Sequence, residues 1–151
     1  MEAPPDPPLY LLDTNILVHL VREDAVGHRL LGQYDLRRRQ PRPLICEVTH
    51  GELHPLALQF QWGAHRVRRA QELLDYFVTV SISSDSVYET YAEMDQYCVA
   101  QGRVLGDNDV WIAAVTEVSL AHLLTTDRDF DPLHGVFITG EWVDPQLDVR
   151  P

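Results

Sequence analysis

The sequence predicts an α/β protein with a central, mainly parallel sheet of about five strands. Short apolar runs alternate with longer amphipathic stretches, an order typical of parallel strands joined by helices. At 151 residues the chain is most simply one domain, long enough to bury a core. Its hydrophobic content of 45% and charged content of 23% fit a soluble globular protein, and no stretch approaches the ~20 apolar residues of a membrane span.

The first expected strand ends on a carboxylate. Residues 9–12 (LYLL) form a short apolar run of the kind buried on both faces in the middle of a parallel sheet. Asp13 follows at the carboxyl end of this strand, where open α/β sheets place their ligands. Thr14 or Asn15 is expected to cap the helix that continues through residues 16–20. Receiver domains and phosphatases also carry one aspartate here, so its role depends on the acids that follow.

The remaining elements continue the alternation, with bounds expected from apolar periodicity and turn residues. They are, in order, a helix at 25–39, a strand at 43–46, helices at 47–61 and 64–76, a strand at 77–82, a helix from 83–85 to 100, a helix at 108–118, and strands at 122–125 and 136–138. Pro55 is expected to lie in the helix at 47–61 and kink it. We expect residues 1–151 to form one domain, with 1–8 and about 143–151 loosely ordered.

The charged residues argue against several classes of protein. The formal net charge is -11, and all 12 basic residues are arginines. A P-loop requires a lysine for phosphate and is therefore excluded. Receiver domains and haloacid-type phosphatases also normally use a lysine, and the phosphatases have a second aspartate two residues after the first, where this chain has Asn15. A phosphohydrolase with Asp13 as nucleophile is thus disfavoured, and failure to form an aspartyl-phosphate mimic with beryllium fluoride would remove it.

The cysteines and the first residues bear on the cellular compartment. Cys46 and Cys98 lie far apart in apolar or amphipathic segments and are expected to be buried thiols rather than a disulfide or a metal site. The N-terminus lacks the basic start and apolar core of a signal peptide. We therefore expect a cytoplasmic protein without a membrane partner.

Three further acids, Glu52, Asp109 and Asp127, each lie just before or within an apolar segment. In a regular helix His50 and His54 share one face, and Glu52 points almost the opposite way. The histidine pair and Glu52 therefore cannot serve one site. A zinc site at the two histidines lacks a third ligand nearby and does not match the order H-E-x-x-H.

The acids of the last third of the chain are spaced two residues apart. If both are helical, Asp107 and Asp109 lie on opposite sides of their helix. Asp109 is in phase with small, close-packing residues and is the candidate for a buried functional acid, whereas Asp107 is expected to be an N-cap. Asp127 falls just past a strand end, as Asp13 does, and Asp129 follows on a turn. An ordinary Asp-rich turn is the alternative there.

Arginines crowd the first half of the chain, while acids dominate from residue 72 onward. A basic patch on an acidic protein can still hold a phosphate backbone locally. The candidates for such contacts are Arg37, Arg38, Arg66 and Arg69. Solvated helix faces are the alternative explanation for these arginines.

Four segments together resemble the PIN-domain ribonucleases, and specifically the VapC-type toxins of bacterial and archaeal toxin–antitoxin pairs. The segments are LLDTN at 11–15, T-x-G-E-L at 49–53, ND-x-x-IAA at 108–114 and LLTTDRDF at 123–130. Each motif alone is weak, but the four occur in the family's order and at plausible spacing. The resemblance covers about residues 9–130 and implies a three-layer α/β/α PIN-like domain.

The resemblance implies a metal-dependent endoribonuclease. Carried over by position, the family's acidic quartet falls on Asp13, Glu52, Asp109 and Asp127, with Asn15 and Thr125 as supporting polar residues and Asp129 as a further participant. Clustered carboxylates repel each other unless a cation joins them, and oxygen-only ligands indicate Mg²⁺ or Mn²⁺ rather than zinc. Asp13, Asp109 and Asp127 are the expected metal ligands. One or two ions would lower the pKa of bound water and clamp the scissile phosphate, leaving 3′-hydroxyl and 5′-phosphate ends.

The resemblance also implies partners. The substrate would be single-stranded or looped RNA, with its flanks near Arg37, Arg66 and Trp62, although Trp62 also fits a partly buried core aromatic. A cognate VapB-like antitoxin would lay its tail across the acidic site and present arginine to the carboxylates, and the toxin would form a homodimer. The alternative of a different class is a PIN-fold binding protein with weak or no nuclease activity. The net charge of -11 favours it slightly, and a lack of metal binding would favour it decisively.

Overall fold

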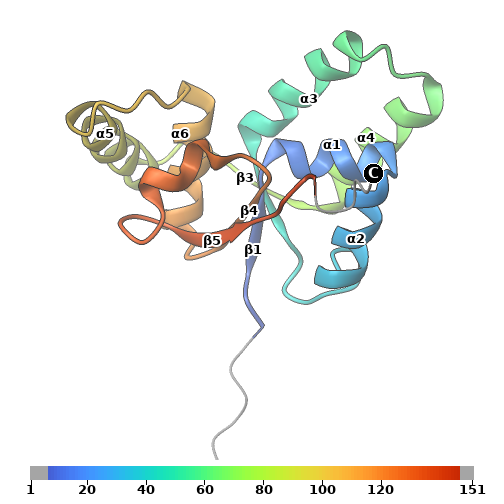
Figure 1. Cartoon of the computed structure of the whole chain (residues 1–151), viewed down its shortest axis with the longest axis horizontal. Helices are drawn as coiled ribbons and strands as arrows, with labels where there is room; N and C mark the ends of the chain where they lie inside the picture. The colour runs from blue at the N-terminus through green and yellow to red at the C-terminus, as the bar shows by residue number, and fades with distance from the viewer. Residues whose placement is uncertain (1–6, 147–151) are drawn as a thin grey trace, which may run out of the picture.

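The computed structural model describes residues 7–146, in which a five-stranded sheet has helices on both faces (Figure 1). The strands are β1 (Tyr10–Leu12), β2 (Leu44–Cys46), β3 (Val78–Val80), β4 (His122–Thr125) and β5 (Thr139–Trp142). The helices are α1 (Thr14–Arg22), α2 (Ala25–Tyr34), α3 (Glu47–Gln59), α4 (Ala64–Tyr76), α5 (Asp85–Ala100), α6 (Asp107–Val118) and the 3₁₀ helix η1 (Arg128–Leu133). The sheet order is β3-β2-β1-β4-β5, and every neighbouring pair is parallel. The predicted parallel α/β fold is confirmed.

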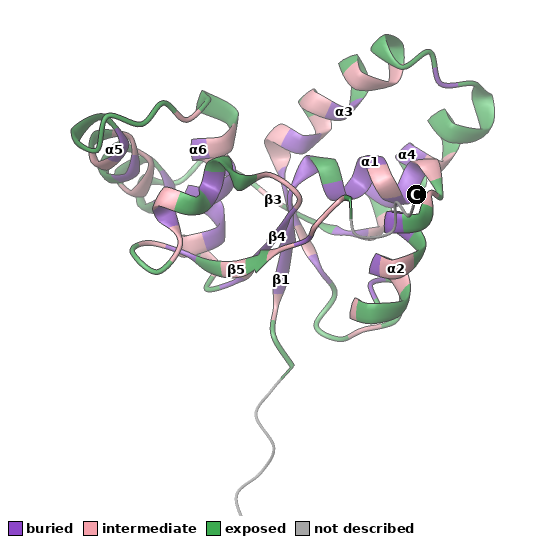
Figure 2. Ribbon diagram, in the orientation of Figure 1, coloured by how far each residue is buried: buried purple, intermediate pink, exposed green. Residues whose placement is uncertain are grey.

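The central strands are buried on both faces, which produces three layers. Successive residues of a strand point to opposite faces, so Leu12 packs among the buried residues of α1, α2 and α4, while Leu11 packs among those of α5 and α6. Leu124 and Leu123 of β4 divide in the same way. Buried residues accordingly follow the sheet and the inward sides of the helices (Figure 2).

Two elements end or begin elsewhere than the sequence indicated. Helix α2 ends at Tyr34 rather than residue 39, because Asp35 adopts a left-handed conformation (φ 50°) and closes the helix. The last strand is Thr139–Trp142 rather than 136–138. Of the apolar residues that suggested the earlier position, Ile138 is buried in the core, Phe137 packs against that core and Val136 is exposed. Strand β5 instead alternates between exposed and half-buried residues at the edge of the sheet. At Gly140 a Cβ would collide with the Leu123 carbonyl oxygen, so a side chain there would push β5 from β4.

Two of the helices that begin at the carboxyl edge, α1 and α6, have N-caps that differ from the prediction. The N-cap of α1 is Asp13, because Thr14 is already helical and its amide donates to the Asp13 carboxylate. The N-cap of α6 is Gly106, and Asp107 is the first helical residue rather than the cap. The Asp107 carboxylate instead accepts a hydrogen bond from the Tyr91 hydroxyl at 3.3 Å.

The described chain is packed almost to its last residues. Val143 is buried, and its amide donates to the Thr125 carbonyl at 2.7 Å, so residue 143, where the sequence indicated the start of a loose end, is packed in the fold. Residues 1–6 and 147–151 lie outside the described part. Cys46 and Cys98 are buried free thiols, as predicted. Within residues 7–146, no helix has the length and apolar character needed to cross a membrane.

Candidate metal centre

Two neighbouring strands deliver aspartates to the same edge of the sheet. Leu12 of β1 is in register with Leu124 of β4, and the Asp13 amide donates to the Leu124 carbonyl at 3.0 Å. Asp13 follows β1 directly, and Asp127 follows β4 by two residues. Because parallel strands end at a common edge, residues more than a hundred positions apart in sequence lie side by side.

Asp13 is the most buried acid of this group, with 4% of its surface exposed. Its Oδ1 accepts a hydrogen bond from the Thr14 amide at 2.8 Å, and its Oδ2 accepts one from the Thr125 hydroxyl at 2.7 Å. The pKa of the Asp13 carboxyl is raised to about 7, mainly by burial. The two hydrogen bonds lower this pKa, whereas the charges of Asp109 and Glu52 raise it. A nearby cation would therefore stabilise the ionised form strongly.

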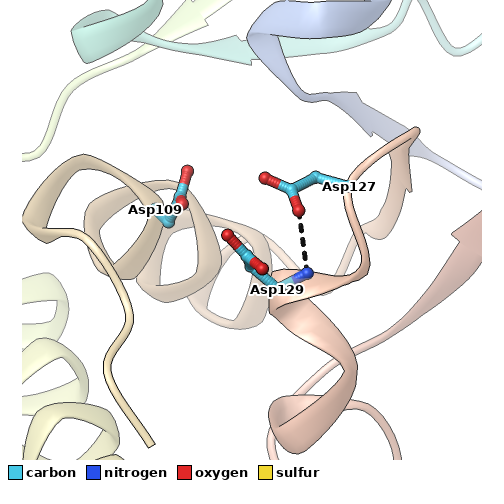
Figure 3. Close-up of side chains that lie close together, drawn as sticks. All are labelled: Asp109, Asp127 and Asp129. Atoms are coloured by element: carbon cyan, nitrogen blue, oxygen red, sulfur yellow. Dashed lines mark hydrogen bonds between the residues drawn. The ribbon is translucent and has the colours of Figure 1, made fainter.

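The loop after β4 links the aspartates through a threonine. The Thr125 hydroxyl, which donates to Asp13, also accepts a hydrogen bond from the Asp127 amide at 2.9 Å. The Asp127 Oδ1 then accepts from the Asp129 amide at 2.8 Å, the dashed line in Figure 3. Thr125 thus holds Asp13 and Asp127 in a fixed relation. The other carboxylate oxygen of Asp127 has no hydrogen bond from any described residue, which leaves it available to a ligand.

Asp109 faces this loop from the first turn of α6 (Figure 3). One carboxylate oxygen from each of Asp109, Asp127 and Asp129 lies within 4.8 Å of the other two. Partial burial raises the pKa of Asp109 to about 6, and the charges of Asp127, Glu52 and Asp129 add to that rise. The structure thus places Asp129, predicted as a further participant, in the same group as Asp109 and Asp127.

Glu52 reaches the group from α3 and is held by two buried threonines. The Thr14 hydroxyl donates to Glu52 Oε1 at 2.7 Å and lies 2.9 Å from the Thr49 hydroxyl. Because the Thr14 proton is committed to Glu52, the Thr49 hydroxyl donates to Thr14. Neither threonine was among the predicted site residues. The available signals were that Thr14 follows Asp13 and that Thr49 precedes Glu52 by one helical turn.

The donor set of this site fits a hard divalent cation. The converging side chains offer carboxylate oxygens and no nitrogen or sulfur, which suits Mg²⁺ or Mn²⁺. Burial is the main cause of the raised pKa values of Asp13 and Asp109, and the charges of neighbouring acids add to it. A bound cation would offset both effects by stabilising the ionised carboxylates. By their spacing, Asp109, Asp127 and Asp129 could hold an ion, with Asp13 beside them.

Among the described residues, three other polar residues singled out in the sequence form no hydrogen bond with the acids of this site. Asn15 is exposed on the first turn of α1. His50 Nε2 lies 2.8 Å from the Thr79 hydroxyl, and His54 Nδ1 donates to the His50 carbonyl at 2.8 Å. The two histidines are therefore engaged on α3 and with β3, in agreement with their predicted separation from Glu52.

The arginines considered for RNA contacts occupy two different ends of the sheet. Arg37 and Arg38 lie in the segment between α2 and β2, which leads into the amino end of β2 (Figure 1). They therefore lie at the edge opposite to the acids, where the Arg37 guanidinium stacks 4.9 Å from the centre of the Tyr76 ring. Arg66 is exposed near the start of α4. Because α4 ends just before the amino end of β3, its first turn lies toward the carboxyl edge of the sheet.

Arg69 and Trp62 are engaged within the protein. The Arg69 Nε donates to the Leu20 carbonyl at 2.9 Å and lies 3.3 Å from a Glu23 carboxylate oxygen. Trp62 is buried in the helical core beside the sheet, with 8% of its surface exposed. Trp62 is therefore a core aromatic rather than an exposed platform for RNA bases.

The protein has a three-layer α/β/α fold, and acids from four separate segments lie at the carboxyl edge of its parallel sheet. This combination of fold and acidic site indicates the class of protein to which the chain belongs. The chain belongs to the PIN domain family, whose model matches residues 10–134. Its relatives include a protein of Haemophilus influenzae (strain R2866) named Ribonuclease VapC1, which is 30% identical over 107 residues, or 70% of this chain and 76% of that protein. The same name belongs to a 29% identical relative from strain Rd of that species, with the same coverage. The resemblance inferred from the sequence motifs is confirmed.

Solved structures agree at the level of the fold. VapBC2 from Rickettsia felis, bound to a DNA fragment from its promoter, superposes with a TM-score of 0.72 at 18% identity and covers 88% of this chain and 97% of that one. VapBC-1 from nontypeable Haemophilus influenzae has a TM-score of 0.70 at 21% identity and covers 89% and 97%.

Proposed function

We propose that this chain is a VapC-type endoribonuclease toxin that hydrolyses RNA phosphodiester bonds with Mg²⁺ or Mn²⁺ at the acidic site. The observation that carries the proposal is the convergence of carboxylates from β1, α3, α6 and the loop after β4 on one edge of the sheet. The name Ribonuclease VapC1 of its relatives supports the same activity.

The side chains would divide the work as follows. Asp109, Asp127 and Asp129, with Asp13 beside them, would hold the cation, and Thr125 would keep Asp13 and Asp127 at a fixed separation. A bound cation would supply a Lewis acid that lowers the pKa of water and screens the negative charge of the scissile phosphate. Because the threonine hydrogen bonds already fix two of the carboxylates, little reorganisation would be needed when substrate arrives.

Glu52 has a different part in this proposal. Its Oε1 is held by the Thr14 hydroxyl, and the hydroxyl of Thr49 in turn holds Thr14. The second oxygen, Oε2, accepts no hydrogen bond from a described residue and would orient water at the site or complete the ligand set. Cleavage by water attack would leave a 3′-hydroxyl and a 5′-phosphate.

We infer that the chain acts in the cytoplasm with a VapB-like antitoxin, and as a homodimer. Structural neighbours that were solved as VapBC complexes support an antitoxin partner. The acidic edge would suit a cationic side chain of such a partner, since an arginine could form hydrogen-bonded ion pairs with the carboxylates in place of the metal ion. A PIN-fold binding protein with little nuclease activity is the second candidate, because the net charge of -11 opposes RNA binding.

The test is cleavage of a mixed pool of structured RNA by the wild type and by Asp13→Asn, with magnesium, with manganese and with a chelator. We expect metal-dependent cutting with 5′-phosphate ends that the variant loses. Manganese binding is measured in parallel by calorimetry. A wild type that neither cuts RNA nor binds manganese would favour the binding protein, whereas manganese binding without cutting would indicate a narrow RNA target.

A further inference from the structure

The segment that follows β4 carries one positively charged side chain among its aspartates. Arg128 stands between Asp127 and Asp129, and its guanidinium carbon lies 3.6 Å from the centre of the Trp142 ring. The Arg128 side chain is 61% exposed, and its Nη1 lies 3.5 Å from an oxygen of Asp131, a distance too long for a strong ion pair. The arginine is thus seated on an aromatic ring while most of it faces solvent.

The ring beneath Arg128 is itself fixed. Trp142 is the last residue of β5 and is in register with Thr125 of β4. Its indole Nε1 donates to the Thr126 carbonyl at 3.0 Å, so the loop that carries the acids also anchors the ring. A guanidinium that stacks by its face keeps its N–H edges free for an anion. The stacking therefore orders a long side chain and leaves its hydrogen-bond donors available.

Arg128 and the aspartates point to different sides of the loop. Asp127 and Asp129 lie toward Asp109 (Figure 3), whereas Arg128 lies toward β5, over Trp142. Among the described residues, neither Asp127 nor Asp129 forms an ion pair with Arg128. The guanidinium consequently does not neutralise the metal centre, and its charge remains available to an anion that arrives from outside beside that centre.

We propose that Arg128, held on Trp142, binds a backbone phosphate of the RNA next to the scissile phosphate, on the β5 side of the metal centre. This inference rests on the proposed ribonuclease function. A chain with net charge -11 and a cluster of acids repels RNA, so productive binding needs local cations. Planar guanidinium groups bind phosphate oxygens in pairs. Arg37 and Arg38 lie at the opposite edge of the sheet, too far away to contact the RNA phosphates beside the scissile one.

The experiment measures binding of a fluorescein-labelled, mixed-sequence, single-stranded RNA by anisotropy over a series of salt concentrations at fixed Mg²⁺. The full chain carries Asp13→Asn throughout to stop cleavage. In that background Arg128→Ala is compared with Arg42→Ala, which removes the same charge from another exposed arginine that also lies over an aromatic ring, that of Tyr76, at the amino end of β2. Loss of one phosphate contact should make the slope of log K against log salt less steep by about 0.7 for single-stranded RNA.

We expect Arg128→Ala to weaken RNA binding and flatten the salt dependence, while Arg42→Ala changes neither. Arg128→Lys should keep the salt slope but bind less tightly, because lysine keeps the charge and loses the planar stack. Trp142→Phe should behave like the parent. Thermal unfolding of each variant separates a contact with RNA from a loss of fold.

Equal slopes for Arg128→Ala and Arg42→Ala, in a parent that binds RNA, would overturn the role of Arg128 alone. A parent that binds no RNA, together with a wild type that cuts none, would overturn the ribonuclease function and this inference with it.

Discussion

Asp13→Asn should stabilise the metal-free protein at alkaline pH, although it removes a side chain that makes two hydrogen bonds. The Asp13 carboxyl has a pKa of about 7 in the folded chain, against an ordinary value of 3.8, and burial is the main cause. As pH rises above the ordinary value, the unfolded chain releases this proton while the folded chain keeps it until about pH 7. The free energy of unfolding of the wild type therefore falls through that window and then levels off.

The size of the effect follows from the shift. A difference of about three pKa units, at about 1.4 kcal/mol per unit, corresponds to about 4 kcal/mol at pH 8. Asparagine avoids this cost because it is neutral at every pH. It also disturbs the hydrogen bonds from Thr14 and Thr125, which should cost about 1–2 kcal/mol. The variant should therefore be more stable by about 2 kcal/mol at pH 8, and less stable by about 1–2 kcal/mol near pH 4.

The assay is urea unfolding of the wild type and Asp13→Asn in a chelating buffer at intervals between pH 4 and pH 8. Asp107→Asn is the matched control, because it removes the same charge from an exposed position on the same edge of the sheet. Added magnesium at pH 8 should raise the stability of the wild type more than that of Asp13→Asn, since binding to the folded state stabilises it. A stability difference that does not change with pH, or a variant that is less stable throughout, would refute the assignment of Asp13 as a buried acid with a raised pKa.

Three further outcomes are expected. Asp109→Asn should abolish RNA cleavage and weaken manganese binding measured by calorimetry, whereas Asp107→Asn should do much less; equal damage would mean that the assignment of faces on α6 is wrong. Thr125→Val should lower the free energy of unfolding by about 1–3 kcal/mol and reduce cleavage, because it removes the hydroxyl between two aspartates; a Thr125→Val enzyme as active as the wild type would remove its positioning role. Replacing His50 and His54 with alanine should leave cleavage intact in the RNA assay, and lost activity would revive a role for zinc.

How much of the fold could be predicted depended on how local the signal was. Strand β1 is a run of apolar residues buried on both faces, and both its place in the sheet centre and the position of Asp13 follow from that run. Strand β5 has exposed and half-buried residues at the sheet edge, so its sequence carries little periodicity and the prediction moved to the core residues before it. The end of α2 was also missed, because Asp35 adopts a left-handed conformation that no apolar pattern announces.

The site shows the same division. The motifs placed Asp13 and Asp127 just after strands, and parallel strands end at one edge of the sheet, so their convergence was predictable. Glu52 and Asp109 lie within helices, so their approach to that edge depends on the tertiary structure. The resemblance named Asp129 as a further participant, but an Asp-rich turn needs no ligand, and only the structure shows its distance from Asp109 and Asp127. The hydrogen bonds of Thr14 with Thr49 and with Glu52 were equally hidden, since they join residues from the start of α1 and from α3 that are 35 or more positions apart.

The sequence by itself determined the α/β class, the parallel sheet and the family, because each of these depends on local periodicity or on the order of short motifs. The tertiary structure alone decided which acids lie within reach of one ion, which threonines hold them, and which arginines share their edge of the sheet. Those features depend on distances between segments that are remote along the chain. They are set by strand register and helix packing, which a single sequence does not display.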